Sequence, residues 1–119
     1  MRYESEKKKS EAINDLHRSF AEADAKQMQS DYKALLQRPE FRRILVSILK
    51  RARVFGSISY DTVETNAVMK AIGFRECGVD IYMSANAADG EMVLKAIQER
   101  NEIERDRKAR IEAVITNER

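Results

Sequence analysis

Few residues in this chain could do catalytic chemistry, and they do not cluster. His17 is the only histidine and lies on a polar helical surface, where we expect an exposed side chain. Cys77 is the only cysteine, and its apolar surroundings predict a buried, unreactive thiol. The carboxylates Glu102 and Glu104 belong to a charged helix and are expected to be solvated. The sequence therefore predicts a protein that is not an enzyme, with no cofactor, no metal and no small-molecule substrate.

The strongest chemical signal is positive charge around Pro39, the only proline. Residues 34–60 carry six basic side chains and one acidic side chain, whereas residues 61–90 carry two basic and five acidic ones. The candidate binding residues are the cations of a predicted helix over residues 39–53, namely Arg42, Arg43, Lys50, Arg51 and Arg53. We predict that they lie on its flanks and outer side, where they dock a protein or contact DNA phosphates. Docking is favoured, because no aromatic residues interleave for base stacking and because segment 61–90 can supply complementary charge.

A second group of residues is the run Gly73-Phe74-Arg75-Glu76-Cys77-Gly78. A glycine inside a helix costs roughly 1 kcal/mol relative to alanine, so two of them need a reason. We predict that Gly73 and Gly78 let a neighbouring helix approach closely. Arg75 would then reach an acidic partner or a carbonyl, for instance at a helix C-terminus. The alternative is that Arg75 contacts a partner chain.

Helices must position these residues, since the chain is 43% hydrophobic and 35% charged, with four glycines and one proline. Apolar spacing predicts helices over residues 3–37, 39–53 and 62–85, and a last helix that begins near residue 90. We expect Gly56 to adopt the left-handed conformation after the second helix.

Several polar residues match helix-capping patterns. Ser30 or Asp31 could begin a separate short helix over residues 32–37. The pair Asp61 and Glu64 has the spacing of a capping box. The last helix could be capped by one of two residues, Asp89 or Asn86.

The resulting prediction is an all-α fold with a compact three-helix core over residues 31–100. A charged helical arm, residues 1–30, and a charged helical extension, residues 101–119, flank this core. The helix over residues 62–85 is apolar around much of its surface, so we expect it to be the most buried element. Thin apolar stripes over residues 10–28 and 103–115 exceed what a small core could cover. No apolar run approaches the roughly 20 residues that span a bilayer, so we expect no membrane anchor.

Two motifs in this core resemble those of a small family encoded by tailed bacteriophages, particularly short-tailed ones. The first has the pattern P-x-x-R-R-x-L-x-x-(I/L)-L followed by V-F, and it is matched by Pro39, Arg42, Arg43, Leu45, Ile48, Leu49, Val54 and Phe55. The second has the pattern G-x-R-x-x-G-(L/V), and it is matched by Gly73, Arg75, Gly78 and Val79. The resemblance covers about residues 35–100. The chain departs from it at Phe41, where a small residue is common, and at Arg53, where glycine usually precedes Val-Phe.

The resemblance implies a virion or assembly component, since such genes sit among head-assembly and packaging genes. We therefore expect a non-enzymatic virion protein that is made in the host cytoplasm. Its partners would be other virion proteins, either in a homo-oligomer or on a larger ring such as a portal, tail or internal core. The alternative is a DNA-contacting packaging or genome-ejection factor that acts through the basic helix 39–53.

Overall fold

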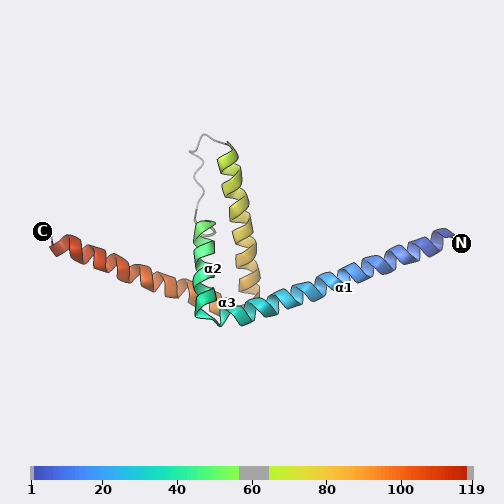
Figure 1. Ribbon diagram of the computed structural model, residues 1–119, viewed down its shortest axis with the longest axis horizontal. Helices are drawn as coiled ribbons and strands as arrows, with labels where there is room; N and C mark the ends of the chain where they lie inside the picture. Colours follow the sequence, from blue (N-terminus) through green and yellow to red (C-terminus); the bar gives the residue numbers. More distant parts are fainter. Residues whose placement is uncertain (1, 57–64, 118–119) are drawn as a thin grey trace.

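The computed structural model describes residues 2–56 and 65–117, and within these ranges its regular elements are three helices (Figure 1). Helix α1 spans Arg2–Leu36, α2 spans Pro39–Arg51 and α3 spans Thr65–Asn117. The predicted all-α fold with long helical extensions is confirmed.

The helices form a shallow V with a stem rising from its base (Figure 1). α1 and residues 90–117 of α3 extend in opposite directions from the base, so the two termini lie at opposite ends of the molecule. α2 and residues 65–88 of α3 run antiparallel beside each other and form the stem. The molecule measures 91 × 41 × 16 Å, and its radius of gyration is 22.3 Å. A compact domain of this length would have a radius of gyration of about 13.5 Å, so the chain is far more extended than a globule.

Pro39 sets the turn between α1 and α2. Arg38 has an extended backbone (φ −92°, ψ 124°), as is usual for a residue that precedes proline. Pro39 is the first residue of α2, where its missing N–H costs nothing. α1 is continuous to Leu36, so the prediction of a separate short helix over residues 32–37, capped by Ser30 and Asp31, is wrong. Capping residues alone do not interrupt a helix when neither glycine nor proline follows them.

α2 ends in a Schellman motif. The backbone N–H of Val54 donates to the carbonyl of Leu49 at 3.1 Å, and that of Arg53 donates to the carbonyl of Lys50 at 3.1 Å. This motif places Arg53 in the left-handed region, with φ 56°. The prediction that Gly56 adopts this conformation is wrong, because the described glycines all have negative φ. In this motif the left-handed residue directly follows the C-cap. The C-cap is Ala52, so the left-handed residue is Arg53.

α3 changes direction at Asp89, which has non-helical dihedrals (φ −161°, ψ 87°). Its Oδ1 accepts a hydrogen bond from the backbone N–H of Met92 at 3.2 Å, so Asp89 caps the helical segment 90–117, as one of the two predicted caps. Two glutamines, Gln29 of α1 and Gln37 directly after its end, contact this break. Gln37 donates to Asp89 Oδ2 at 3.3 Å, and Gln29 donates to the Ala87 carbonyl at 3.2 Å.

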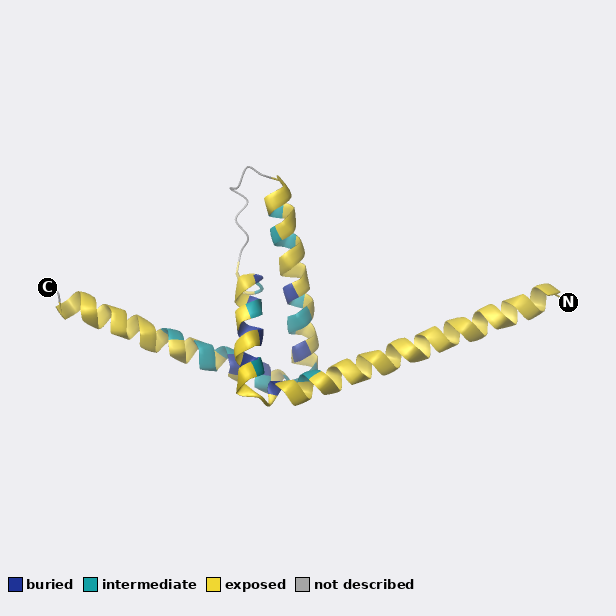
Figure 2. Ribbon diagram, in the orientation of Figure 1, coloured by how far each residue is buried: buried dark blue, intermediate teal, exposed yellow. Residues whose placement is uncertain are grey.

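The apolar core lies where the three helices meet. We call this cluster the hub, and its buried members are Leu36, Leu45, Leu49, Ala85 and Val93. The rings of Tyr32 and Phe41 pack edge to face beside it, with centroids 6.3 Å apart. Figure 2 shows buried residues at this meeting point and along the stem, whereas both ends of the V are exposed. We call residues 2–30 the N-terminal arm and residues 101–117 the C-terminal arm.

The expectation that helix 62–85 is the most buried element is wrong. Between residues 65 and 85, only Gly78 and Ala85 are buried, and the large side chains of Met69, Phe74 and Met83 are exposed. Cys77 is also exposed, against expectation. The reason is that α2 covers one face of this segment and α1 packs only near its end, at Ile81 and Ala85. Most of its remaining surface has no neighbour among the described residues. The predicted capping box, Asp61 and Glu64, lies outside the described residues.

Candidate docking surface

Arg42 joins all three helices and does not face outward. Its side chain is 5% exposed in relative terms. Its Nε donates to Glu99 Oε1 in α3 at 2.7 Å, and its Nη1 donates to the carbonyl of Leu36, the last residue of α1, at 2.9 Å. The prediction that Arg42 lies on the flank or outer side of its helix is therefore wrong. A buried guanidinium needs a carboxylate and carbonyls around it, and the fold supplies both.

The other predicted cations lie on the exposed side of α2 and just beyond its end. Lys50 forms an ion pair with Glu104, and Arg100 donates to the same carboxylate at 3.1 Å. Arg43 and Arg51 are exposed, and within the described residues no ion pair involves either of them. Arg53 is exposed at the left-handed turn. Within the described residues, the carboxylates that pair with cations of α2 are Glu99 and Glu104. Asp61 and Glu64, two of the predicted complementary carboxylates, lie outside the described residues.

The second motif ties the stem to the end of α2. Arg75 Nε donates to the carbonyl of Arg53 at 3.2 Å, which confirms the prediction of a carbonyl at a helix C-terminus. Gly78 is buried, and a Cβ built on it would lie 2.5 Å from Ala52 Cβ and 2.8 Å from Val54 Cγ2. Close packing at Gly78 is therefore confirmed. The prediction of close packing at Gly73 is wrong, because no described atom lies within 4 Å of a Cβ built there.

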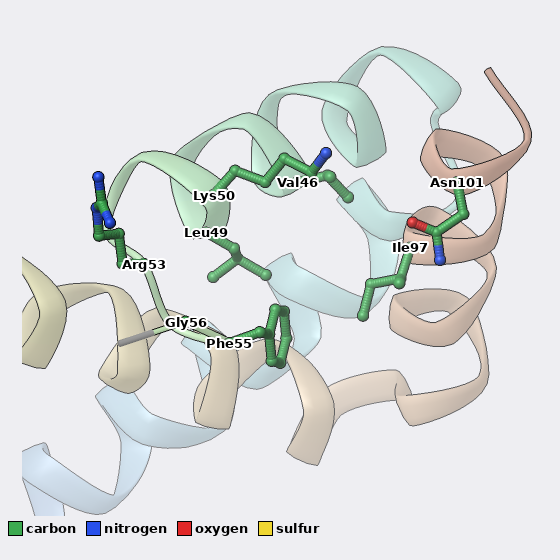
Figure 3. A pocket seen from close by; sticks show the side chains of 8 residues that line it. All are labelled: Val46, Leu49, Lys50, Arg53, Phe55, Gly56, Ile97 and Asn101. Carbon is green, nitrogen blue, oxygen red and sulfur yellow. The ribbon is translucent and has the colours of Figure 1, made fainter. Parts of the chain in front are cut away.

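A groove of about 620 Å³ opens between α2 and the second half of α3 (Figure 3). In this view the side chains of Leu49, Phe55 and Ile97 point into one space, and Lys50 and Asn101 lie at its edges. The residues that line the groove are Val46, Leu49, Lys50, Arg53, Phe55, Gly56, Ile97 and Asn101. An apolar floor beside basic side chains fits a partner segment that carries an apolar side chain next to an acidic one.

The sequence reasoning missed Ile97 and Asn101 as part of this surface. They belong to a helix predicted to continue the core, and nothing in their spacing indicates that they face the end of α2. Phe55 could have been found, because it follows the left-handed turn and belongs to the first motif. Its ring packs edge to face on Tyr82, with centroids 5.1 Å apart, and yet remains 61% exposed.

Within residues 2–56 and 65–117, no group of three or more histidine, cysteine, aspartate or glutamate side chains could hold a metal ion. In the same described ranges, no helix is long and apolar enough to cross a membrane. Compared with protein-family models, with curated proteins and with solved structures, the chain matches none of them.

Proposed function

We propose that the chain is a non-enzymatic structural or assembly component of a tailed-phage virion, which docks on a larger oligomeric ring through the stem. The observation that carries this proposal is the amount of surface that the fold leaves uncovered. The chain exposes 9893 Å², whereas a folded monomer of 13.7 kDa exposes about 6,600 Å². An excess of about 3,000 Å² is typical of a subunit whose contacts lie in an assembly, because obligate interfaces are of this size.

The groove and its surroundings support docking through the stem. Phe55 is a large, exposed apolar side chain, and Ile44 on the outer side of α2 is 57% exposed. Arg43 and Arg51 lie on the exposed side of the same helix. Aromatic and arginine side chains are residue types that are enriched at protein interfaces.

The roles of the motif residues give further support. Pro39, Arg42, Arg75 and Gly78 all act in the geometry that joins α2 to α1 and α3. Arg53 occupies a left-handed position, which favours glycine, and glycine is what the resembled phage family usually carries there. The motifs therefore agree with a shared fold, and the virion role follows from the resemblance.

Analysis of purified particles of the phage that encodes the chain tests this proposal. We expect mass spectrometry to detect the chain in gradient-purified virions, and imaging with a tag on residue 119 to place it at a single ring-bearing vertex or within an internal core. A chain that remains in the lysate and never sediments with particles would contradict the proposal.

A pair of variants tests the docking surface itself. Phe55→Glu places a charge in the groove, and we expect it to abolish incorporation into particles. Met83→Glu is the matched control, because Met83 is equally exposed at 61% and does not line the groove. Equal incorporation of both variants would exclude the groove as the docking surface. Circular dichroism checks that both variants keep their helices.

Direct DNA contact through α2 is less well supported. Of the five candidate cations, Arg42 is buried and Lys50 is paired with Glu104, which reduces the charge available to phosphates. Arg43 and Arg51 remain exposed. Neutralising few phosphates gives weak binding that salt removes easily. A salt titration of duplex binding tests this, and a slope that flattens in the double variant Arg43→Gln, Arg51→Gln would favour the DNA-contacting alternative.

A further inference from the structure

The two arms carry small apolar patches that nothing in the described chain covers. The N-terminal patch consists of Ile13, Leu16 and Phe20, which are 53–58% exposed. The C-terminal patch consists of Ile111, Val114 and Ile115, which are 51–62% exposed. Each set follows helical spacing of three, four or seven residues, so its members lie on one side of their helix. Long helices gain most of their stability from packing such a face, which both arms lack here.

The two patches of one chain cannot cover each other. Leu16 lies 20 residues before the end of α1, about 30 Å along the helix. Val114 lies 25 residues after Asp89, about 37 Å along the second half of α3. The arms extend in opposite directions from the hub (Figure 1). Any helix that covers these patches must therefore belong to another molecule.

Local charge indicates which patch fits which. Residues 10–24, which surround the N-terminal patch, carry four acidic side chains and one basic side chain, a net charge of −3. Residues 105–115, which surround the C-terminal patch, carry four basic and two acidic side chains, a net charge of +2. All of these residues are exposed. Around the patches, pairing two N-terminal arms or two C-terminal arms brings like charges together, whereas pairing one of each brings opposite charges together. Over their full lengths, residues 2–30 and 101–117, the two arms are each neutral.

We propose that copies of this chain associate head to tail, with the N-terminal arm of one copy packed along the C-terminal arm of the next. The occupant of each patch is a second copy of the same chain. Along the V, α1 runs toward the hub and residues 90–117 run away from it (Figure 1). A copy that is displaced along this axis and rotated by the angle between the two limbs therefore lays its α1 beside its neighbour's C-terminal arm, with both helices running in the same direction. Such a heterologous contact uses two different surfaces of each subunit, and it therefore builds a ring or an open filament.

The uncovered area is sufficient for this arrangement. A stable interface buries about 800 Å² per partner, and a head-to-tail subunit makes two of them, about 1,600 Å² in all. The excess surface of about 3,000 Å² estimated from size scaling exceeds this requirement and leaves the stem available. Neighbouring hubs would then lie roughly 65 Å apart, the sum of the distances from the hub to the two patches. This association is separate from docking on a larger ring, so either can fail without the other.

Two single variants of the full chain test the proposal in solution. Phe20→Glu destroys the N-terminal patch and keeps the C-terminal one, and Ile111→Glu does the reverse. We expect the unmodified chain to form species larger than a dimer in sedimentation and native mass spectrometry. Each variant alone should be monomeric, and a 1:1 mixture should form a dimer and nothing larger, because only one contact can form. Ala25→Glu and Ala109→Glu, on the opposite sides of the same arms, should assemble like the unmodified chain.

The outcomes separate this proposal from its competitors. An unmodified chain that is monomeric up to its highest soluble concentration would overturn the proposal, whatever the particle experiments show. A dimer formed by Ile111→Glu alone would indicate pairing of two N-terminal arms and would also overturn it. Association that weakens as salt is raised would support it, since the surfaces carry opposite charge.

Discussion

Leu49 and Leu16 are the same residue type in the same secondary structure, and their surroundings differ completely. Leu49, in α2, is 1% exposed and packs in the hub where the three helices meet. Leu16 is 53% exposed on the N-terminal arm, the part of α1 that extends away from the hub. The hub has the contacts of a globular protein, with buried leucines, a buried arginine and a glycine that admits a neighbouring backbone. The arms have the charge pattern of solvated helices and only a narrow apolar side. The difference teaches that one chain contains a region that folds on its own contacts and a region whose contacts lie elsewhere.

The largest expected difference comes from shortening one leucine in each region. Leu49→Ala removes buried methyl groups and leaves a cavity, so we expect it to lower the free energy of unfolding by about 3 kcal/mol. Leu16→Ala should change it by less than about 0.5 kcal/mol, because its side chain is already in water. Urea unfolding of dilute protein measures both. Equal losses for the two variants would mean that the N-terminal arm is packed in the isolated chain.

Adjacent arginines give the next comparison. Arg42→Ala leaves Glu99 and the Leu36 carbonyl without their shared donor, and breaking such a buried pair should lower the free energy of unfolding by about 2–3 kcal/mol. Glu99 is partly exposed, which limits the loss. Arg43→Ala should have an effect of less than about 0.5 kcal/mol, since its side chain is exposed. A comparable loss of unfolding free energy for Arg43→Ala would show that side chains on the exposed side of α2 also make contacts that stabilise the fold.

Two glycines of α3 should respond in opposite directions to the same change. Gly78→Ala forces a methyl group against Ala52 and Val54, and we expect a loss of about 1–2 kcal/mol. Gly73→Ala meets open space among the described residues and should gain up to about 1 kcal/mol from helix propensity. Thermal unfolding followed by circular dichroism measures both. Stabilisation by both alanines would contradict the close packing of α2 on α3.

The smallest expected effect lies at the end of α2. Arg53→Gly removes a side chain from a left-handed position, and we expect stabilisation by about 0.5–1 kcal/mol. Arg51→Gly is the control at the last residue of the helix and should destabilise by less than about 1 kcal/mol. Paired thermal melts compare the two variants. If Arg53→Gly also destabilises, contacts of the Arg53 side chain outweigh its backbone cost.

Local features of this fold could be predicted from the sequence. Pro39 as the start of a helix, Asp89 as a cap and Arg75 at a helix C-terminus all follow from backbone hydrogen-bonding needs, which act over a few residues. The burial of Arg42 and the exposure of Cys77 and Met83 could not be predicted, because they depend on which elements are present to cover a helix face. Apolar spacing tells which side of a helix needs a partner, but it carries no information on whether the partner belongs to the same chain.

The groove shows the same limit for the candidate site. Phe55 belongs to a motif that the sequence displays, whereas Ile97 and Asn101 reach the groove only because α3 turns at Asp89 and brings its second half beside α2. The prediction that Gly56 adopts the left-handed conformation is wrong for a related reason. The Schellman motif is fixed by counting from the C-cap, and a helix end that differs by two residues moves the left-handed position.

The break at Asp89 also acts as a lever. Residues 90–117, which include the C-terminal arm, form a helical segment about 42 Å long. Its direction is fixed by the backbone of Asp89 and by the two glutamines that contact the break. A rotation of 1° at this point moves the tip of the arm by about 0.7 Å, by simple geometry on that length. In a head-to-tail array, this angle repeats at every subunit and accumulates into curvature. The curvature of such an array would then depend on the dihedral angles of Asp89.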